Sequence, residues 1–179
     1  MAGEIHGADD VRKTHTHAYA TFQSPNAGRL GAVSDGRVSL SRRRRPVRLP
    51  RSPEHAALPV PVLASLLDAV PVLSDAEPAG LVVAAAGGGN TPASYLELAL
   101  PLIERGIPVV LTTRCPSGHV MPGYAFPGGS TRWWDAGALF AGTLDALKAR
   151  VLLALGLGAG APLDELAALC ATFGGGRRQ

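Results

Sequence analysis

Lysine is scarce in this chain of 179 residues, because only Lys13 and Lys148 among its 17 basic residues are lysines. Cysteine is scarce as well: Cys115 and Cys170 cannot build a disulfide framework, and they are compatible with a reducing compartment. The polar first residues lack the apolar segment of a secretory signal, and no run reaches the ~18 apolar residues of a membrane span. We therefore expect a soluble, cytoplasmic protein with no membrane partner.

Acidic charge is sparse at the front of the chain. Residues 1–51 hold ten basic and four acidic residues, a charge of +6, whereas residues 52–179 hold seven and ten, a charge of −3. The arginines at 42–45 supply much of this excess, and such a run is able to neutralise the phosphates of a nucleic acid. No stacking aromatic residues interleave with them, so we favour a solvated linker and expect no nucleic-acid partner.

The arginine and proline composition of residues 42–57 marks a linker between two parts of the chain. In the first part, residues 1–41, apolar positions flank Asp35-Gly36, a pair that is typical of the turn of a β-hairpin. The second part, residues 58–179, holds most of the hydrophobic residues that make up 46% of the chain. We expect this second part to form the main domain.

Short apolar runs alternate with longer amphipathic segments throughout the second part. We expect strands at residues 59–63, 81–86, 108–112 and 138–141, helices at 93–105, 144–157 and 162–173, and a helical turn at 66–70. Strands that alternate with helices are typical of a parallel sheet. The fold class is therefore α/β: a small parallel sheet flanked by helices, preceded by a β-hairpin segment left from another domain.

Three glycines and Asn90 follow the predicted strand at 81–86. Ligands of open α/β sheets bind outside the carboxyl ends of the strands, so the side chain of Asn90 is placed where it can contact one. On spacing alone we favour the simpler alternative, a tight strand-to-helix turn in which Asn90 is a helix cap. The spacing of a GxGxxG fingerprint is absent, and we expect no nucleotide site.

Three other patterns have simpler explanations than a functional site. His15 and His17 lie two apart on a predicted extended segment, but without a clear third ligand we favour exposed histidines and expect no metal. Cys115 has no paired histidine in a recognisable motif, so we interpret it as a small buried thiol. Trp133-Trp134 either forms an exposed patch used in assembly or covers a loop, and the sequence leaves both open.

Segments in both parts of the chain carry a family resemblance: residues 10–14, 20–24 and 28–31 in the first part, and residues 82–90, 106–118, 135–144 and 148–153 in the second. The first set resembles the end of the N-terminal domain, and the second set the C-terminal domain, of bacterial-type L-asparaginases/glutaminases, which make aspartate and ammonia from asparagine. Each segment has low specificity alone, but together they keep the family's order over nearly the whole chain. The resemblance implies hydrolysis of a side-chain amide by a threonine nucleophile, with no metal or organic cofactor.

The resemblance also assigns candidate site residues. Lys13 matches the catalytic lysine of the family's Asp-Val-x-Lys-Thr motif, and a solvated surface lysine is an equally good interpretation. In the family's assemblies one subunit completes its neighbour's site through an asparagine after the glycine turn, here Asn90. A loop residue after the position of Arg114, often a carboxylate, also contributes. This loop has no carboxylate, so Tyr124 is the candidate, although ordinary loop packing is slightly favoured.

The family's two threonines lie in a TGGTI-like turn and a GTD segment, and neither motif occurs in this sequence. We therefore expect the chain to lack the nucleophile and to be inactive alone. Its expected partners are an asparagine-like substrate and either further copies of itself or a separate chain that carries the N-terminal domain. The alternatives are a non-catalytic domain that oligomerises or binds a small ligand, and one half of a split enzyme.

Overall fold

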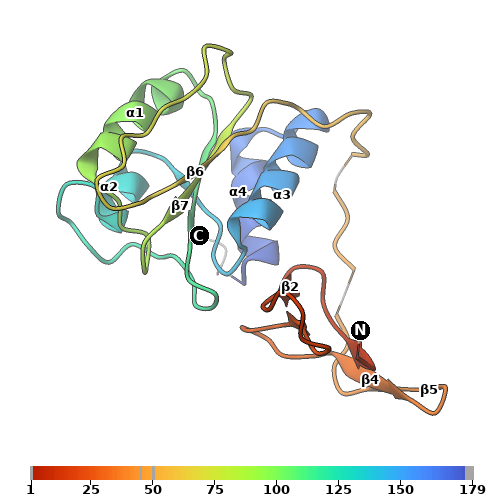
Figure 1. Ribbon diagram of the computed structural model, residues 1–179. Helices are drawn as coiled ribbons and strands as arrows, with labels where there is room; N and C mark the ends of the chain where they lie inside the picture. Colours follow the sequence, from red (N-terminus) through yellow and green to blue (C-terminus); the bar gives the residue numbers. More distant parts are fainter. Residues whose placement is uncertain (1, 45, 50, 176–179) are drawn as a thin grey trace. The chain divides into compact units, whose positions relative to one another are not determined.

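The computed structural model describes residues 2–44, 46–49 and 51–175 (Figure 1). The chain divides into two compact units, Met1–Arg48 and Leu49–Gln179. The first unit contains short antiparallel sheets, and the second contains a parallel sheet with helices. Within the described residues, no helix combines the length and apolar character that crossing a membrane requires.

The first unit holds two antiparallel sheets. Strands β1 (Glu4–Ile5), β4 (Gly31–Ser34) and β5 (Arg37–Leu40) form one, in the order β1-β4-β5, and β2 (Arg12–Lys13) pairs with β3 (Phe22–Gln23) in the other. β4 and β5 form the hairpin that the sequence predicts. Its turn residues Asp35 and Gly36 have φ angles of 49° and 72°, which is the conformation that makes Asp-Gly favourable there.

Two residues of the arginine run stabilise this first unit. The guanidinium group of Arg42 donates hydrogen bonds to the backbone carbonyls of Gly28 and Arg29, at 3.0 and 3.1 Å. Arg44 forms an ion pair with Asp9. Because both arginines bind groups of the same unit, part of the basic charge at the front of the chain has a structural role.

The second unit is built on a parallel sheet of order β6-β7-β8-β9. Its strands are β6 (Val62–Ala64), β7 (Leu81–Ala85), β8 (Val109–Thr113) and β9 (Leu139–Phe140). The two central strands are fully buried, as expected for nearly continuous apolar runs that have helices on both faces. The helices are α1 (Ala93–Glu104), α2 (Ser130–Asp135), α3 (Ala146–Gly158) and α4 (Leu163–Phe173). The predicted α/β class is confirmed.

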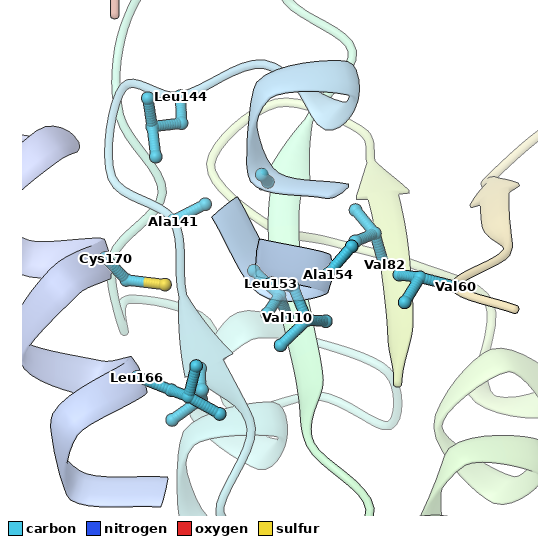
Figure 2. Packing of buried hydrophobic residues seen from close by; sticks show 11 residues of the cluster. Val60, Val82, Val110, Ala141, Leu144, Leu153, Ala154, Leu166 and Cys170 are labelled. Atoms are coloured by element: carbon cyan, nitrogen blue, oxygen red, sulfur yellow. The ribbon is translucent and has the colours of Figure 1, made fainter. Parts of the chain in front are cut away.

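Alternate residues of β7 face opposite sides of the sheet. Val82 lies on one face, in a cluster that also contains Leu153 of α3 and Leu166 of α4 (Figure 2). Val83 lies on the other face, in the cluster that contains Tyr95 of α1 and Trp133 of α2. The period of two that governs strand side chains therefore divides the core into two clusters, one for each pair of helices.

Two expectations for this unit are wrong in detail. The first strand begins at Val62, not at residue 59, and no helix forms at residues 66–70, where the structure has a turn. The phenol of Tyr95 donates to the carbonyl of Ala64 at 2.8 Å and accepts a hydrogen bond from the backbone N–H of Leu66. The backbone after β6 is thus bound to a side chain of α1 rather than to a helix of its own. Sequence analysis also missed α2.

The two thiols differ in environment, which predicts a difference in reactivity. Cys170 lies in the α3/α4 cluster (Figure 2), where burial raises the pKa of its thiol to about 12, whereas Cys115 is half-buried. Since the thiolate is the reactive form, we expect a disulfide reagent at about pH 8 to modify Cys115 quickly and Cys170 only after unfolding. Absorbance of the released thiol measures both rates, with Cys115→Ser as the control. Rapid reaction of that variant would contradict the prediction.

Candidate functional site

The turn after β7 lies at the carboxyl edge of the sheet. The backbone N–H groups of Gly89 and Asn90 donate to the carbonyl of Ala86, at 3.1 and 2.9 Å, and Ala86 forms a bridge with Asn90. Gly89 has a φ of +115°, and a Cβ there would lie 3.1 Å from the Cβ of Ser130. Glycine at this position therefore allows both the turn and its close packing.

The side chain of Asn90 has an unusual environment. Its amide oxygen is buried, and no hydrogen-bond partner lies within reach among the described residues. Leaving a buried polar group unpaired costs about 1–3 kcal/mol, so such groups in native structures require an explanation. Helix α1 begins after Pro92 without a side-chain cap, and Asn90 therefore does not serve as the cap that its position allowed.

The structure brings Tyr124 to the same turn. A Cβ built on Gly88 would lie 3.9 Å from Cε2 of Tyr124, and the backbone N–H of Met121 donates to the carbonyl of Gly88 at 3.4 Å. The ring of Tyr124 is 52% exposed and lies beside the ring of Phe126, with centroids 6.2 Å apart. Tyr124 and Asn90, which are far apart in the sequence, thus flank one turn.

Thr113, at the end of β8, is a further polar residue at this turn that was not predicted from the sequence. Its hydroxyl donates to the carbonyl of Gly87 at 2.7 Å and accepts a hydrogen bond from the backbone N–H of Cys115 at 3.0 Å. Thr113 thereby connects the glycine turn to the loop that follows β8. The signal that identifies it is a polar pair, Thr112-Thr113, at the end of an otherwise apolar strand.

Lys13 belongs to the first unit, where it lies on β2 opposite Phe22. Its side chain is exposed. The buried carboxylate of Asp10 accepts hydrogen bonds from the backbone N–H groups of Asn26 and Ala27, at 3.1 and 2.6 Å, and anchors the start of this strand to the next loop. The strand that carries Lys13 is therefore held at its base, while the ammonium group faces outward.

The histidines at 15 and 17 serve local structure. Nδ1 of His15 accepts hydrogen bonds from the backbone N–H groups of His17 and Ala18, both at 3.0 Å. Nowhere in the described ranges do three or more His, Cys, Asp or Glu side chains gather closely enough to hold a metal ion.

The adjacent tryptophans have different environments. Trp133 is fully buried in the cluster beneath α1, and Trp134 is 36% exposed, with its ring edge against Phe140 at a centroid distance of 5.3 Å. Trp133 is therefore a core residue, and only Trp134 contributes to the surface.

The profile of the Glutaminase/Asparaginase C-terminal domain matches residues 64–169, which is more than half of the chain. The chain belongs to the glutaminase/asparaginase family. The profile of the asparaginase N-terminal domain matches residues 1–46, so the family match begins in one domain and continues into the next, as the resemblance predicts.

Three relatives of this asparaginase-family chain show how much of the family's length it covers. It is 32% identical over 180 residues to the probable L-asparaginase periplasmic of Haemophilus influenzae, covering 88% of the chain and 46% of the relative. It is 31% identical over 167 residues to L-asparaginase 2 of Escherichia coli, covering 83% of the chain and 44% of the relative. It is 41% identical over 87 residues to a probable L-asparaginase of Deinococcus radiodurans, covering 49% of the chain and 26% of the relative. The chain thus spans less than half the length of each relative.

Proposed function

We propose that this chain supplies the C-terminal part of an amidohydrolase that converts L-asparagine and water to L-aspartate and ammonia. The observation that carries the proposal is the buried amide oxygen of Asn90, which has no partner among the described residues and belongs to the turn that Tyr124 approaches at Gly88. Membership of the glutaminase/asparaginase family and three relatives named as L-asparaginases support it.

The candidate residues of the two units have distinct roles in the proposal. An amide oxygen accepts hydrogen bonds, and L-asparagine offers donors in its α-ammonium group and its side-chain amide, so Asn90 contacts the substrate by accepting from one of them. Tyr124, whose ring lies near Gly88 of the same turn, provides an aromatic face and a phenolic hydroxyl. Lys13, in the first unit, assists a nucleophile as general acid–base group: its neutral amine accepts the proton of the nucleophile's hydroxyl, and the resulting ammonium donates a proton to the departing ammonia.

The two threonine motifs of the family do not occur among these 179 residues, so the proposal includes an N-terminal domain that carries the nucleophile. We expect no ammonia release from L-asparagine by the purified chain alone, and release once an asparaginase N-terminal domain is added. That N-terminal domain alone is the control. Ammonia release by the chain alone would refute the claim that the nucleophile lies outside these residues. Absence of ammonia release from every mixture would refute the proposed amidohydrolase function.

A non-catalytic domain that binds a small amino-acid-like ligand is the second candidate, because an unpaired buried acceptor fits a ligand whether or not a reaction follows. Calorimetric titration of the chain with L-asparagine and L-aspartate distinguishes the two: binding by a chain that no N-terminal domain activates would favour this candidate. A cytoplasmic location and a homo-oligomer remain our predictions, to be checked by cell fractionation and by sedimentation.

Asn90→Ala provides a test of the proposed contact. In the complemented enzyme we expect KM to rise about 10- to 100-fold, since a hydrogen bond to a charged group contributes about 1.5–3 kcal/mol. The free energy of unfolding of the chain should not fall, because the oxygen that is removed has no partner among the described residues. Initial rates and denaturant unfolding measure the two quantities. Lower stability with an unchanged KM would show that Asn90 is structural.

A further inference from the structure

A chain of hydrogen bonds begins at Thr91, directly after Asn90. Thr91 is 6% exposed, and its backbone N–H and its hydroxyl both donate to the carbonyl of Gly128, at 2.9 and 3.2 Å. The same hydroxyl accepts a hydrogen bond from Nε1 of the buried Trp133, at 3.1 Å. The donor and acceptor functions of this hydroxyl are therefore both used inside the protein.

Helix α2, which contains Trp133, also forms hydrogen bonds with the loop that carries Tyr124. The hydroxyl oxygen of the buried Ser130 accepts hydrogen bonds from the backbone N–H groups of Gly123 and Tyr124, at 3.1 and 3.4 Å. The carbonyl of Tyr124 accepts a hydrogen bond from the backbone N–H of Thr131 at 3.0 Å. The start of α2 therefore orders the backbone of Tyr124, and Trp133 of this helix reaches Thr91.

We propose that Thr91 is a positioning residue that keeps Asn90 and Tyr124 at a constant separation, through its hydrogen bonds with Trp133 and Gly128. The inference rests on the proposed function. In it, Thr91 does not touch the substrate and acts only by positioning Asn90 and Tyr124. Both candidate contacts lie on loops, which are the mobile parts of a fold unless they are tied down. Misplacement of a contacting group by about 1 Å is enough to cost 10²-fold in rate.

Thr91→Val removes the hydroxyl and keeps the shape of the side chain. The matched control is Thr112→Val, because the hydroxyl of Thr112 is equally buried but donates to the carbonyl of Leu144, at 2.5 Å, on a different loop. Thr91→Ser restores the hydroxyl, and Trp133→Phe removes the indole donor from the other side. Together these variants distinguish the effect of breaking this chain of hydrogen bonds from the general effect of removing a buried hydroxyl.

Amide hydrogen exchange on the full chain gives the first measurement, and it requires no activity. With Thr91→Val and Trp133→Phe we expect exchange about 10-fold faster at residues 91 and 123–131, and with Thr91→Ser and Thr112→Val we expect wild-type exchange there. The double variant should be no faster than either single variant, because both break one chain of hydrogen bonds. Equal effects of Thr91→Val and Thr112→Val on this loop would overturn the proposal.

Kinetics of the complemented enzyme give the second measurement. We expect Thr91→Val to raise KM about 10-fold while Thr112→Val leaves it unchanged, since only the first change displaces the substrate contacts. Faster exchange in the loop with a wild-type KM would overturn the positioning role. If the wild type shows no activity in any assembly, the proposed function fails. The exchange pattern then shows separately whether Thr91 orders the loop.

Discussion

Alanine in place of Gly128 is expected to lower the free energy of unfolding by about 3 kcal/mol, and to release the loop that carries Tyr124. Gly128 has a φ of +83°, and a Cβ at this position would overlap the carbonyl oxygen of Thr91. The position of the Cβ is fixed by the backbone of residue 128, and the carbonyl oxygen is a backbone atom of Thr91, so no side-chain rotation can relieve the overlap. The contact between Thr91 and Gly128 must therefore open, and the loop loses its connection to the Asn90 turn.

Denaturant unfolding monitored by circular dichroism measures this loss, and Gly123→Ala is the control. Gly123 lies in the same loop, but a Cβ there would meet nothing within 4 Å. A surface change of this kind stays within about 0.5 kcal/mol of the wild type. If the two variants have the same stability, the close approach at Gly128 does not contribute to holding the loop.

Lys13→Met is expected to lower kcat of the complemented enzyme by about 10²- to 10⁴-fold, which is the usual contribution of an acid–base group. Methionine keeps much of the length of the side chain and removes the ammonium group. Because Lys13 is exposed on β2, the variant should fold like the wild type. A large kinetic loss without a loss of stability would identify a catalytic group rather than a solvated lysine.

Lys148, the other lysine of the chain, is the matched control. It lies on α3 in the second unit, where its Nζ forms an ion pair with Asp145 at 2.7 Å. Lys148→Met should cost only about 0.3–0.5 kcal/mol of stability and leave kcat unchanged. Initial rates at saturating L-asparagine measure both variants, and equal losses for the two lysines would refute the role proposed for Lys13.

The sequence was sufficient to predict most elements of the second unit. Strands β7 and β8 are mostly apolar and contain several β-branched residues, and glycine at 106 marks the end of the helix between them. The helical turn expected at residues 66–70 was wrong, because the phenol of Tyr95, which is distant in the sequence, binds the backbone of Ala64 and Leu66. A pattern within five residues contains no information about such a partner.

The candidate site was predictable only in part. The glycine turn and its place after a buried strand led to Asn90, and family resemblance led to Tyr124 and Lys13. Thr91 was not predicted, because its hydrogen bonds join residues that are 37 and 42 positions apart in the chain. Whether the oxygen of Asn90 has a partner likewise depends on groups brought near it by folding.

The two adjacent tryptophans show which properties of this chain follow from the local sequence and which depend on tertiary structure. Periodicity, turn residues and helix-end residues are local properties, and they account for the α/β class, the parallel sheet and the hairpin of this chain. Trp133 and Trp134 are identical neighbours in the sequence, yet one is fully buried and donates to Thr91, while the other is 36% exposed. Burial and hydrogen-bond partners depend on which surfaces meet after the chain folds, because the groups that exclude water come from distant segments.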